Sequence, residues 1–118
     1  MLRVILVEDE PLVAMMMEDL LTDLGCEIVG SFGSLAAAMA WMEAPPVRID
    51  GALLDVNLGG GETAFPVAEA LHRRGVPFAF ATGYGALPSD SYPETPLIHK
   101  PVDLEQLLPV VQAFAAAA

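Results

Sequence analysis

Hydrophobic residues gather in five short runs along the chain, and helix-length amphipathic stretches fill most of the gaps between them. The runs are Leu2–Val7, Glu27–Phe32, Gly51–Asp55, Phe78–Thr82 and Pro96–Lys100. The first, third and fourth runs are almost continuously apolar, which is typical of strands buried on both faces of a sheet. Strands that alternate with helices predict βαβ units. The pattern therefore predicts an α/β fold with a doubly wound, five-stranded parallel sheet.

The stretches between the runs predict four helices, at residues 11–24, 34–42, 63–74 and from Asp103 onward. Asp103 followed three residues later by Gln106 is a capping-box pattern. The first helix is expected to bury a stripe formed by Leu12, Val13, Met16, Leu20, Leu21 and Leu24. The methionines at 15–17 and Trp41 are expected to fill the core. The Gly- and Pro-rich segment 83–96 leaves room only for a short, irregular or missing further helix.

Length and charge limit the classes of protein that fit this pattern. With 118 residues the chain is expected to be a single domain, residues 1–118. It has 16 acidic and 5 basic residues, for a net charge of −11, yet 54% of its residues are hydrophobic, which excludes a disordered acidic tail. The absence of Lys/Arg stripes argues against nucleic acid and membrane surfaces as ligands. A lone cysteine and no long apolar run favour a cytoplasmic protein.

Chemically useful side chains stand where the predicted strands end. Glu8 and Asp9 follow the first strand, and Asp55, Thr82 and Lys100 end the third, fourth and fifth strands. In a doubly wound sheet the site lies outside the carboxyl ends of the strands, so these residues are expected to share one rim. Lys100 is the single lysine of the chain.

Three carboxylates on one rim repel one another unless a cation joins them or a proton neutralises one. A divalent metal with oxygen ligands, Mg²⁺ above all, is the simplest remedy. Asp55 would then be a nucleophile for a phosphoryl group, and Lys100 and the Thr82 hydroxyl would balance charge on its oxygens. The acidic turn Glu8–Pro11 is unlike the Gly-rich turn that dinucleotide and flavin sites require.

Four motifs in this order resemble the receiver domain of two-component response regulators. They are Val7-Glu8-Asp9-Glu10-Pro11, Leu53-Leu54-Asp55-Val56-Asn57-Leu58, Ala81-Thr82-Gly83 and His99-Lys100-Pro101. The resemblance covers essentially the whole chain and implies a flavodoxin-like (CheY-like) sheet of order 2-1-3-4-5. It assigns Asp55 as phosphoacceptor, Glu8, Asp9, Asp55 and the Asn57 carbonyl as Mg²⁺ ligands, Thr82 as switch hydroxyl and Lys100 as phosphoryl partner. It also implies a cis Lys100–Pro101 peptide and a phosphohistidine donor, on a sensor histidine kinase or histidine phosphotransfer protein.

The run Phe80-Ala81-Thr82-Gly83-Tyr84 further resembles the FATGUY subgroup, mostly single-domain receivers of alphaproteobacteria. Three glycines, 59–61, replace the usual proline-containing turn, so this loop is expected to be mobile. Leu97 stands where the common switch aromatic is found. We therefore hypothesise that Tyr84 and segment 83–96 carry the phosphorylation signal.

These patterns favour a stand-alone response regulator that signals through phosphorylation-controlled protein binding and turns over no metabolite. Its output face is expected on segment 83–96, the fifth strand and the last helix. Val110, Val111 and Phe114 are either core residues or contacts of a partner or weak homodimer. One alternative is a phosphate sink or phosphorelay intermediate without a binding target. The other is a small Asp-based phosphatase, although such an enzyme would want an acid where Asn57 stands.

Overall fold

The fold is built on a parallel sheet whose strand order is β2-β1-β3-β6-β7, in a computed structural model that describes residues 1–83, 92 and 94–118. Its strands are β1 (Leu2–Val7), β2 (Cys26–Phe32), β3 (Gly51–Asp55), β6 (Phe78–Thr82) and β7 (Leu97–His99). All four neighbouring pairs are parallel, with Leu6 beside Leu53 and Asp55 beside Ala81. The predicted strands and the order 2-1-3-4-5 are confirmed.

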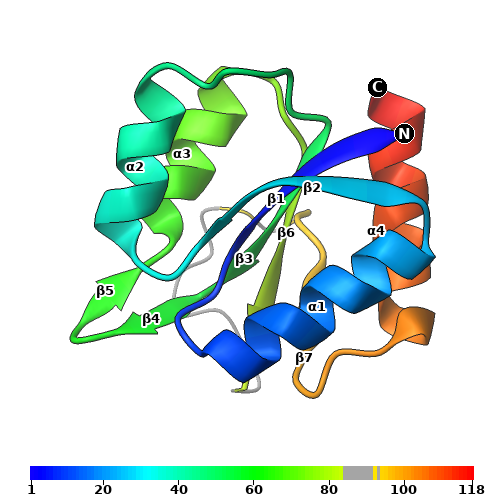
Figure 1. The fold of residues 1–118 in the computed structure, drawn as a ribbon, viewed down its shortest axis with the longest axis horizontal. Coiled ribbons are helices and arrows are strands. Elements are labelled where there is room, and N and C mark those ends of the chain that lie inside the picture. Colours follow the sequence, from blue (N-terminus) through cyan, green and yellow to red (C-terminus); the bar gives the residue numbers. More distant parts are fainter. Residues whose placement is uncertain (84–91, 93) are drawn as a thin grey trace.

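Helices cover both faces of the sheet, as Figure 1 shows. Helices α2 (Leu35–Glu43) and α3 (Phe65–Arg73) lie on one side, and α1 (Pro11–Asp23) and α4 (Leu104–Ala117) lie on the other. Because successive side chains of a strand point to opposite faces of the sheet, β3 contributes residues to the hydrophobic core on both faces. Ala52 and Leu54 pack in the core beneath α2 and α3, and Leu53 packs in the core beneath α1 and α4. None of the helices in the described part of the chain could span a membrane.

The exposed side of α1 differs from the expectation. Met17 and Leu21 are its buried residues, whereas Leu12 is 76% and Met16 53% exposed, and Met15 is exposed as well. Successive residues of an α-helix are turned by about 100°, so a helix that buries Met17 directs Met16 away from the sheet. The prediction that Leu12, Met15 and Met16 fill the core is therefore wrong.

A small antiparallel sheet follows β3 and consists of β4 (Asn57–Gly59) and β5 (Glu62–Thr63). The three glycines at its tip all have positive φ, of 81°, 59° and 81°, a region that other residues rarely adopt. Because Glu62 and Thr63 pair with β4, α3 begins at Phe65 and not at Thr63 as expected. The mobility of the glycine run stays a prediction.

Helix α4 closes the second core layer. Phe114 is buried against Gly51, where any side chain would overlap its ring. Val110 and Val111 are buried too, so the alternative that these three residues form a partner or dimer contact is wrong. The Asp103 carboxylate caps the helix by accepting from the Gln106 backbone N–H at 2.9 Å.

The Gln106 side chain does not complete the capping box. It accepts from the His99 backbone N–H at 2.9 Å and donates to the carbonyls of His99 and Pro101, both at 3.1 Å. These three hydrogen bonds join the end of β7 to the first turn of α4. They hold the backbone on either side of Lys100.

Candidate functional site

A pocket of about 350 Å³ opens at the carboxyl edge of the main sheet. The turn after β1 contributes Asp9, β3 ends at Asp55, and Lys100 follows β7. Parallel strands end at the same edge, so residues far apart in the sequence meet there. The described lining residues are Asp9, Glu10, Asp55, Asn57, Thr82, Gly83 and Lys100.

Lys100 is paired with two carboxylates. Its Nζ lies 2.8 Å from Oε2 of Glu8 and 3.4 Å from Oδ1 of Asp55. The side chain of Glu8 is fully buried, that of Asp55 is 5% exposed and that of Lys100 is 19% exposed. The Lys100 backbone N–H donates to the Thr82 carbonyl at 2.9 Å, and the Lys100–Pro101 peptide is cis, as the resemblance implies. Glu8 therefore lies behind the pocket and holds the ammonium beside Asp55.

Negative charge exceeds what this ammonium balances. Burial, and then the charge of Glu8, raise the pKa of Asp55 to about 7, although Lys100 acts in the opposite direction. Burial alone would lower the pKa of Lys100, but its hydrogen bonds with and attraction to Glu8 and Asp55 outweigh that effect and raise it. The ammonium is thus firmly charged, whereas the buried carboxyl of Asp55 is poised to lose or take up a proton near neutral pH.

The donor set suits a divalent cation. Carboxylate oxygens of Glu8, Asp9 and Glu10 all lie within 4.8 Å of one another, and Asp55 lines the pocket that Asp9 and Glu10 share. Several carboxylates at an open pocket, with room for water, form the environment that Mg²⁺ prefers. Sequence reasoning missed Glu10, which continues the acidic run and lines the pocket. The signal was the third consecutive acid in a strand-to-helix turn.

The other predicted site residues have more varied surroundings. The Thr82 side chain is buried at the pocket, and the Thr82 residue is engaged with its neighbours. The Asn57 side chain is exposed and its Oδ1 accepts from the Gly59 N–H at 3.0 Å, so it serves the β4–β5 hairpin. The ligand role of the Asn57 carbonyl stays a prediction. Tyr84 lies outside the described residues, and so does most of segment 83–96, so their signalling role also stays a prediction.

The arginines of the chain lie at the opposite, amino edge of the sheet. They are Arg3, Arg48, Arg73 and Arg74, near the starts of β1, β3 and β6. Nε of Arg48 lies 3.2 Å from Oδ1 of the buried Asp50, whose other oxygen accepts from the Arg3 N–H at 2.8 Å. Arg74 donates to the carbonyl of Met42. The arginines are therefore kept away from the acidic pocket, and of the five lysine and arginine residues only Lys100 stands at that edge.

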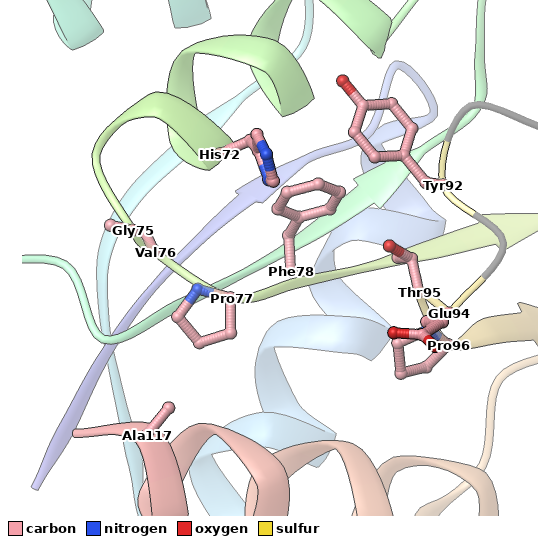
Figure 2. Close-up of a pocket in the computed structure, with 10 residues that line it drawn as sticks. All are labelled: His72, Gly75, Val76, Pro77, Phe78, Tyr92, Glu94, Thr95, Pro96 and Ala117. Atoms are coloured by element: carbon pink, nitrogen blue, oxygen red, sulfur yellow. The ribbon is translucent and has the colours of Figure 1, made fainter.

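A larger hollow, of about 610 Å³, lies at that amino edge (Figure 2). Tyr92 contributes to its wall, and the Tyr92 ring lies 5.4 Å from that of Phe78 and 6.2 Å from that of His72, measured between centroids. Among the described lining residues, Glu94 is the single carboxylate. Size alone therefore does not mark the chemical site, because the acids that can hold a cation are gathered at the other edge.

A third hollow adjoins the acidic pocket and is apolar. It has a volume of about 350 Å³ and is lined by Val13, Met16, Met17, Lys100, Pro101 and Val102. Lys100 belongs to both hollows: its ammonium faces the carboxylates, and its residue also borders the apolar space beside α1. Met16, which lines this hollow, is exposed, and so are Leu12 and Met15 in the adjacent turns of α1.

Comparison with solved structures places this geometry in a family. The solution structure of SdrG from Sphingomonas melonis Fr1 is 42% identical over 98% of this chain and 97% of that one, with a TM-score of 0.82. The REC domain of the PhyR response regulator from Erythrobacter litoralis is 27% identical over 98% and 90%, with a TM-score of 0.82. A response regulator receiver protein from Sinorhizobium medicae WSM419 shares the fold at 24% identity, covering 99% and 97%, with a TM-score of 0.83.

The two other comparisons were negative: no family model matches the chain, and no curated protein does. The identity to a solved relative over nearly the full length, together with the five-stranded sheet and the acidic edge with its single lysine, is nevertheless sufficient. The chain belongs to the response regulator receiver domains.

Proposed function

We propose that Asp55 accepts a phosphoryl group from the phosphohistidine of a sensor histidine kinase or histidine phosphotransfer protein, in a Mg²⁺-dependent reaction. The phosphorylated protein then signals by binding another protein. The observation that carries this proposal is the placement of Lys100, whose Nζ lies 3.4 Å from Oδ1 of a buried Asp55 in a pocket rich in carboxylates. One nucleophile, one cationic partner and a cation-binding acidic set suffice for phosphoryl transfer to a carboxylate.

In the transfer, a carboxylate oxygen of Asp55 attacks the phosphorus atom and forms an acyl phosphate. The bond from phosphorus to the donor's imidazole nitrogen breaks, and the imidazole keeps that electron pair. Asp55 must be ionised to react, which its pKa of about 7 permits near neutral pH. Lys100 then pairs with a phosphoryl oxygen in place of the Asp55 carboxylate. The buried Thr82, at the end of β6, is proposed to donate its hydroxyl to another.

Mg²⁺ would be held by Asp9 and Asp55, with Glu8, Glu10 and the Asn57 carbonyl around it, and would supply positive charge for the phosphoryl oxygens. Without that charge, an incoming phosphoryl group would face carboxylates on several sides. Water ends the phosphorylated state by hydrolysing the acyl phosphate and restoring the Asp55 carboxylate. The protein thus catalyses its own phosphorylation and dephosphorylation and no turnover of a metabolite.

A protein donor is favoured over a small one by the apolar surface beside the pocket. Leu12, Met15 and Met16 expose large apolar side chains on α1, next to the hollow that reaches Lys100. Leu104 and Leu108 are exposed on α4, the other helix of that face. Exposed apolar side chains on the helices beside a reactive site mark a surface for protein contact. A donor helix resting there would bring its phosphohistidine to the edge of the acidic pocket.

Labelling by acetyl phosphate tests the chemistry without a partner. We expect one phosphoryl group per native chain in the presence of Mg²⁺ and none with EDTA. Asp55→Asn should take up none, whereas Asp23→Asn, which removes an exposed carboxylate of α1, should behave as native. Equal labelling of Asp55→Asn and native protein would refute Asp55 as the acceptor.

Donor docking is tested separately. Leu12→Ser and Met16→Ser should each slow transfer from a phosphorylated histidine phosphotransfer protein by about five- to thirtyfold, since each removes about 1–2 kcal/mol of apolar contact. Labelling by acetyl phosphate should not change. Slowing of both reactions would show that the substitutions disturb the pocket and not the docking surface.

A further inference from the structure

The β4–β5 hairpin stands beside the acidic pocket in a fixed position. Val56 and Leu58, on either side of Asn57, are buried in the same core layer as Ala64. The Ala64 N–H donates to the Val56 carbonyl at 3.1 Å and closes the base of the hairpin. The hairpin cannot shift without disturbing these core residues. Its first glycine therefore has a defined place relative to the pocket.

That glycine, Gly59, lies against the carboxylate of Asp9. A Cβ built on Gly59 would stand 3.3 Å from Oδ2 of Asp9, closer than nine in ten real Cβ contacts. The other two glycines of the run differ, because a Cβ on Gly60 or Gly61 would meet nothing within 4 Å. The backbone conformation explains why glycine is favoured at all three positions. The contact with Asp9 distinguishes Gly59 as the glycine of this run that lies beside a carboxylate.

From this contact we propose that Gly59 is a positioning residue for the Asp9 carboxylate, and through it for the divalent cation of the proposed function, on which this inference rests. The bare backbone at residue 59 forms one wall of the space in which the carboxylate turns. A Cβ there would push Oδ2 of Asp9 by a few tenths of an ångström relative to the other carboxylates. The hairpin thus contributes to cation affinity without providing a side-chain ligand.

The glycine run contains its own matched control. Gly59 and Gly61 have the same positive φ of 81°, so the backbone disfavours alanine at both positions. Mg²⁺ affinity is measured by calorimetric titration of native protein, Gly59→Ala and Gly61→Ala. We expect Gly59→Ala to bind Mg²⁺ about tenfold more weakly, the usual loss when the support of a metal ligand is removed. Gly61→Ala should stay within about twofold of native.

A second readout separates positioning from damage to the fold. For Gly59→Ala, the rate of labelling by acetyl phosphate should reach the native value at saturating Mg²⁺. Only the Mg²⁺ concentration that gives half of this rate should be higher than for native protein. Equal losses of Mg²⁺ affinity in the two alanine variants, or a lower saturated rate for Gly59→Ala alone, would overturn the inference. If the native protein bound no Mg²⁺, the proposed function itself would fail, which is a different result.

Should Gly59→Ala prove too unstable to titrate, unfolding by urea decides the matter in the background of Asp9→Ala. Without the carboxylate, the loss of stability caused by Gly59→Ala should fall to that caused by Gly61→Ala. An excess loss that persists after the Asp9 carboxylate is removed would show that Gly59 acts on something else.

Discussion

Replacement of Asp55 by asparagine should stabilise the metal-free protein, and more so at high pH. The pKa of Asp55 rises from 3.8 to about 7 on folding, so between these values the folded protein keeps a proton that the unfolded chain has lost. Stability therefore falls as the pH rises from about 4 through 7 and is then level. The asparagine of the variant carries no charge at any pH. Between pH 5 and pH 8 the shift corresponds to about 2–3 kcal/mol, which is the additional gain expected for Asp55→Asn at pH 8.

Urea unfolding in EDTA at the two pH values measures this difference. Subtracting the native free energy of unfolding at each pH cancels the titrating groups that do not contact Asp55, and Asp23→Asn controls for the loss of one negative charge. Mg²⁺ added at pH 8 should stabilise the native protein, because the ion binds the folded state. Most of the difference in stability between the native protein and Asp55→Asn should then disappear. An equal gain at pH 5 and pH 8, or a native protein more stable than Asp55→Asn at pH 8 without metal, would refute the reasoning.

Three further substitutions test the packing around the site. Lys100→Met should lower the free energy of unfolding by about 2–4 kcal/mol at pH 8, because it leaves the buried Glu8 carboxylate without its cation. Urea unfolding measures this loss, and an unchanged stability would contradict the pairing of Lys100 with Glu8. Phe114→Ala should cost about 3–5 kcal/mol, whereas Leu108→Ala on the exposed side of the same helix should change stability by less than about 0.5 kcal/mol. Gln106→Ala removes three hydrogen bonds to backbone and should cost about 1–2 kcal/mol, seen as a Tm lower by several degrees in a thermal scan.

The sheet and the composition of its carboxyl edge could be predicted because both follow from local sequence and a general rule. Continuously apolar runs mark buried parallel strands, and the residue that ends each run must stand at the same edge as the others. Asp55, Thr82 and Lys100 were placed in this way, although up to 45 positions separate them. No contact between them had to be known beforehand.

The orientation of α1 was predicted wrongly because residues 12–17 are all apolar and indicate no face by themselves. The signal lay in the second half of the helix, where Asp19 and Asp23 stand two turns after Leu12 and Met16 and so share their exposed face, whereas Met17 lies one turn before the buried Leu21. The β4–β5 hairpin was also missed. Its strands have three and two residues, too few to show an alternation, and its pairing depends on the anchoring of Leu58 in the core.

The capping-box prediction was half right for a similar reason. The spacing of Asp103 and Gln106 is local and the backbone cap forms as expected. The Gln106 side chain instead lies against the segment that precedes the helix and donates to the carbonyls of His99 and Pro101. A sequence pattern shows what a side chain can reach within its own helix, and not which tertiary neighbour will compete for it.

All four arginines lie at the amino edge of the sheet, while Glu8, Asp9, Glu10 and Asp55 concentrate negative charge at the carboxyl edge, so the net charge is unevenly distributed over the molecule. A cationic partner approaching through solvent experiences a torque that turns the acidic edge toward it before any contact is made. Collisions at the arginine edge are correspondingly less productive. Such pre-alignment acts over about a Debye length, roughly 10 Å at 0.1 M salt, so the rate of encounter with a basic donor should fall steeply as ionic strength rises. With the donor docked on the apolar side of α1 as proposed, escape from the complex would depend on short-range contact and should be far less sensitive to salt.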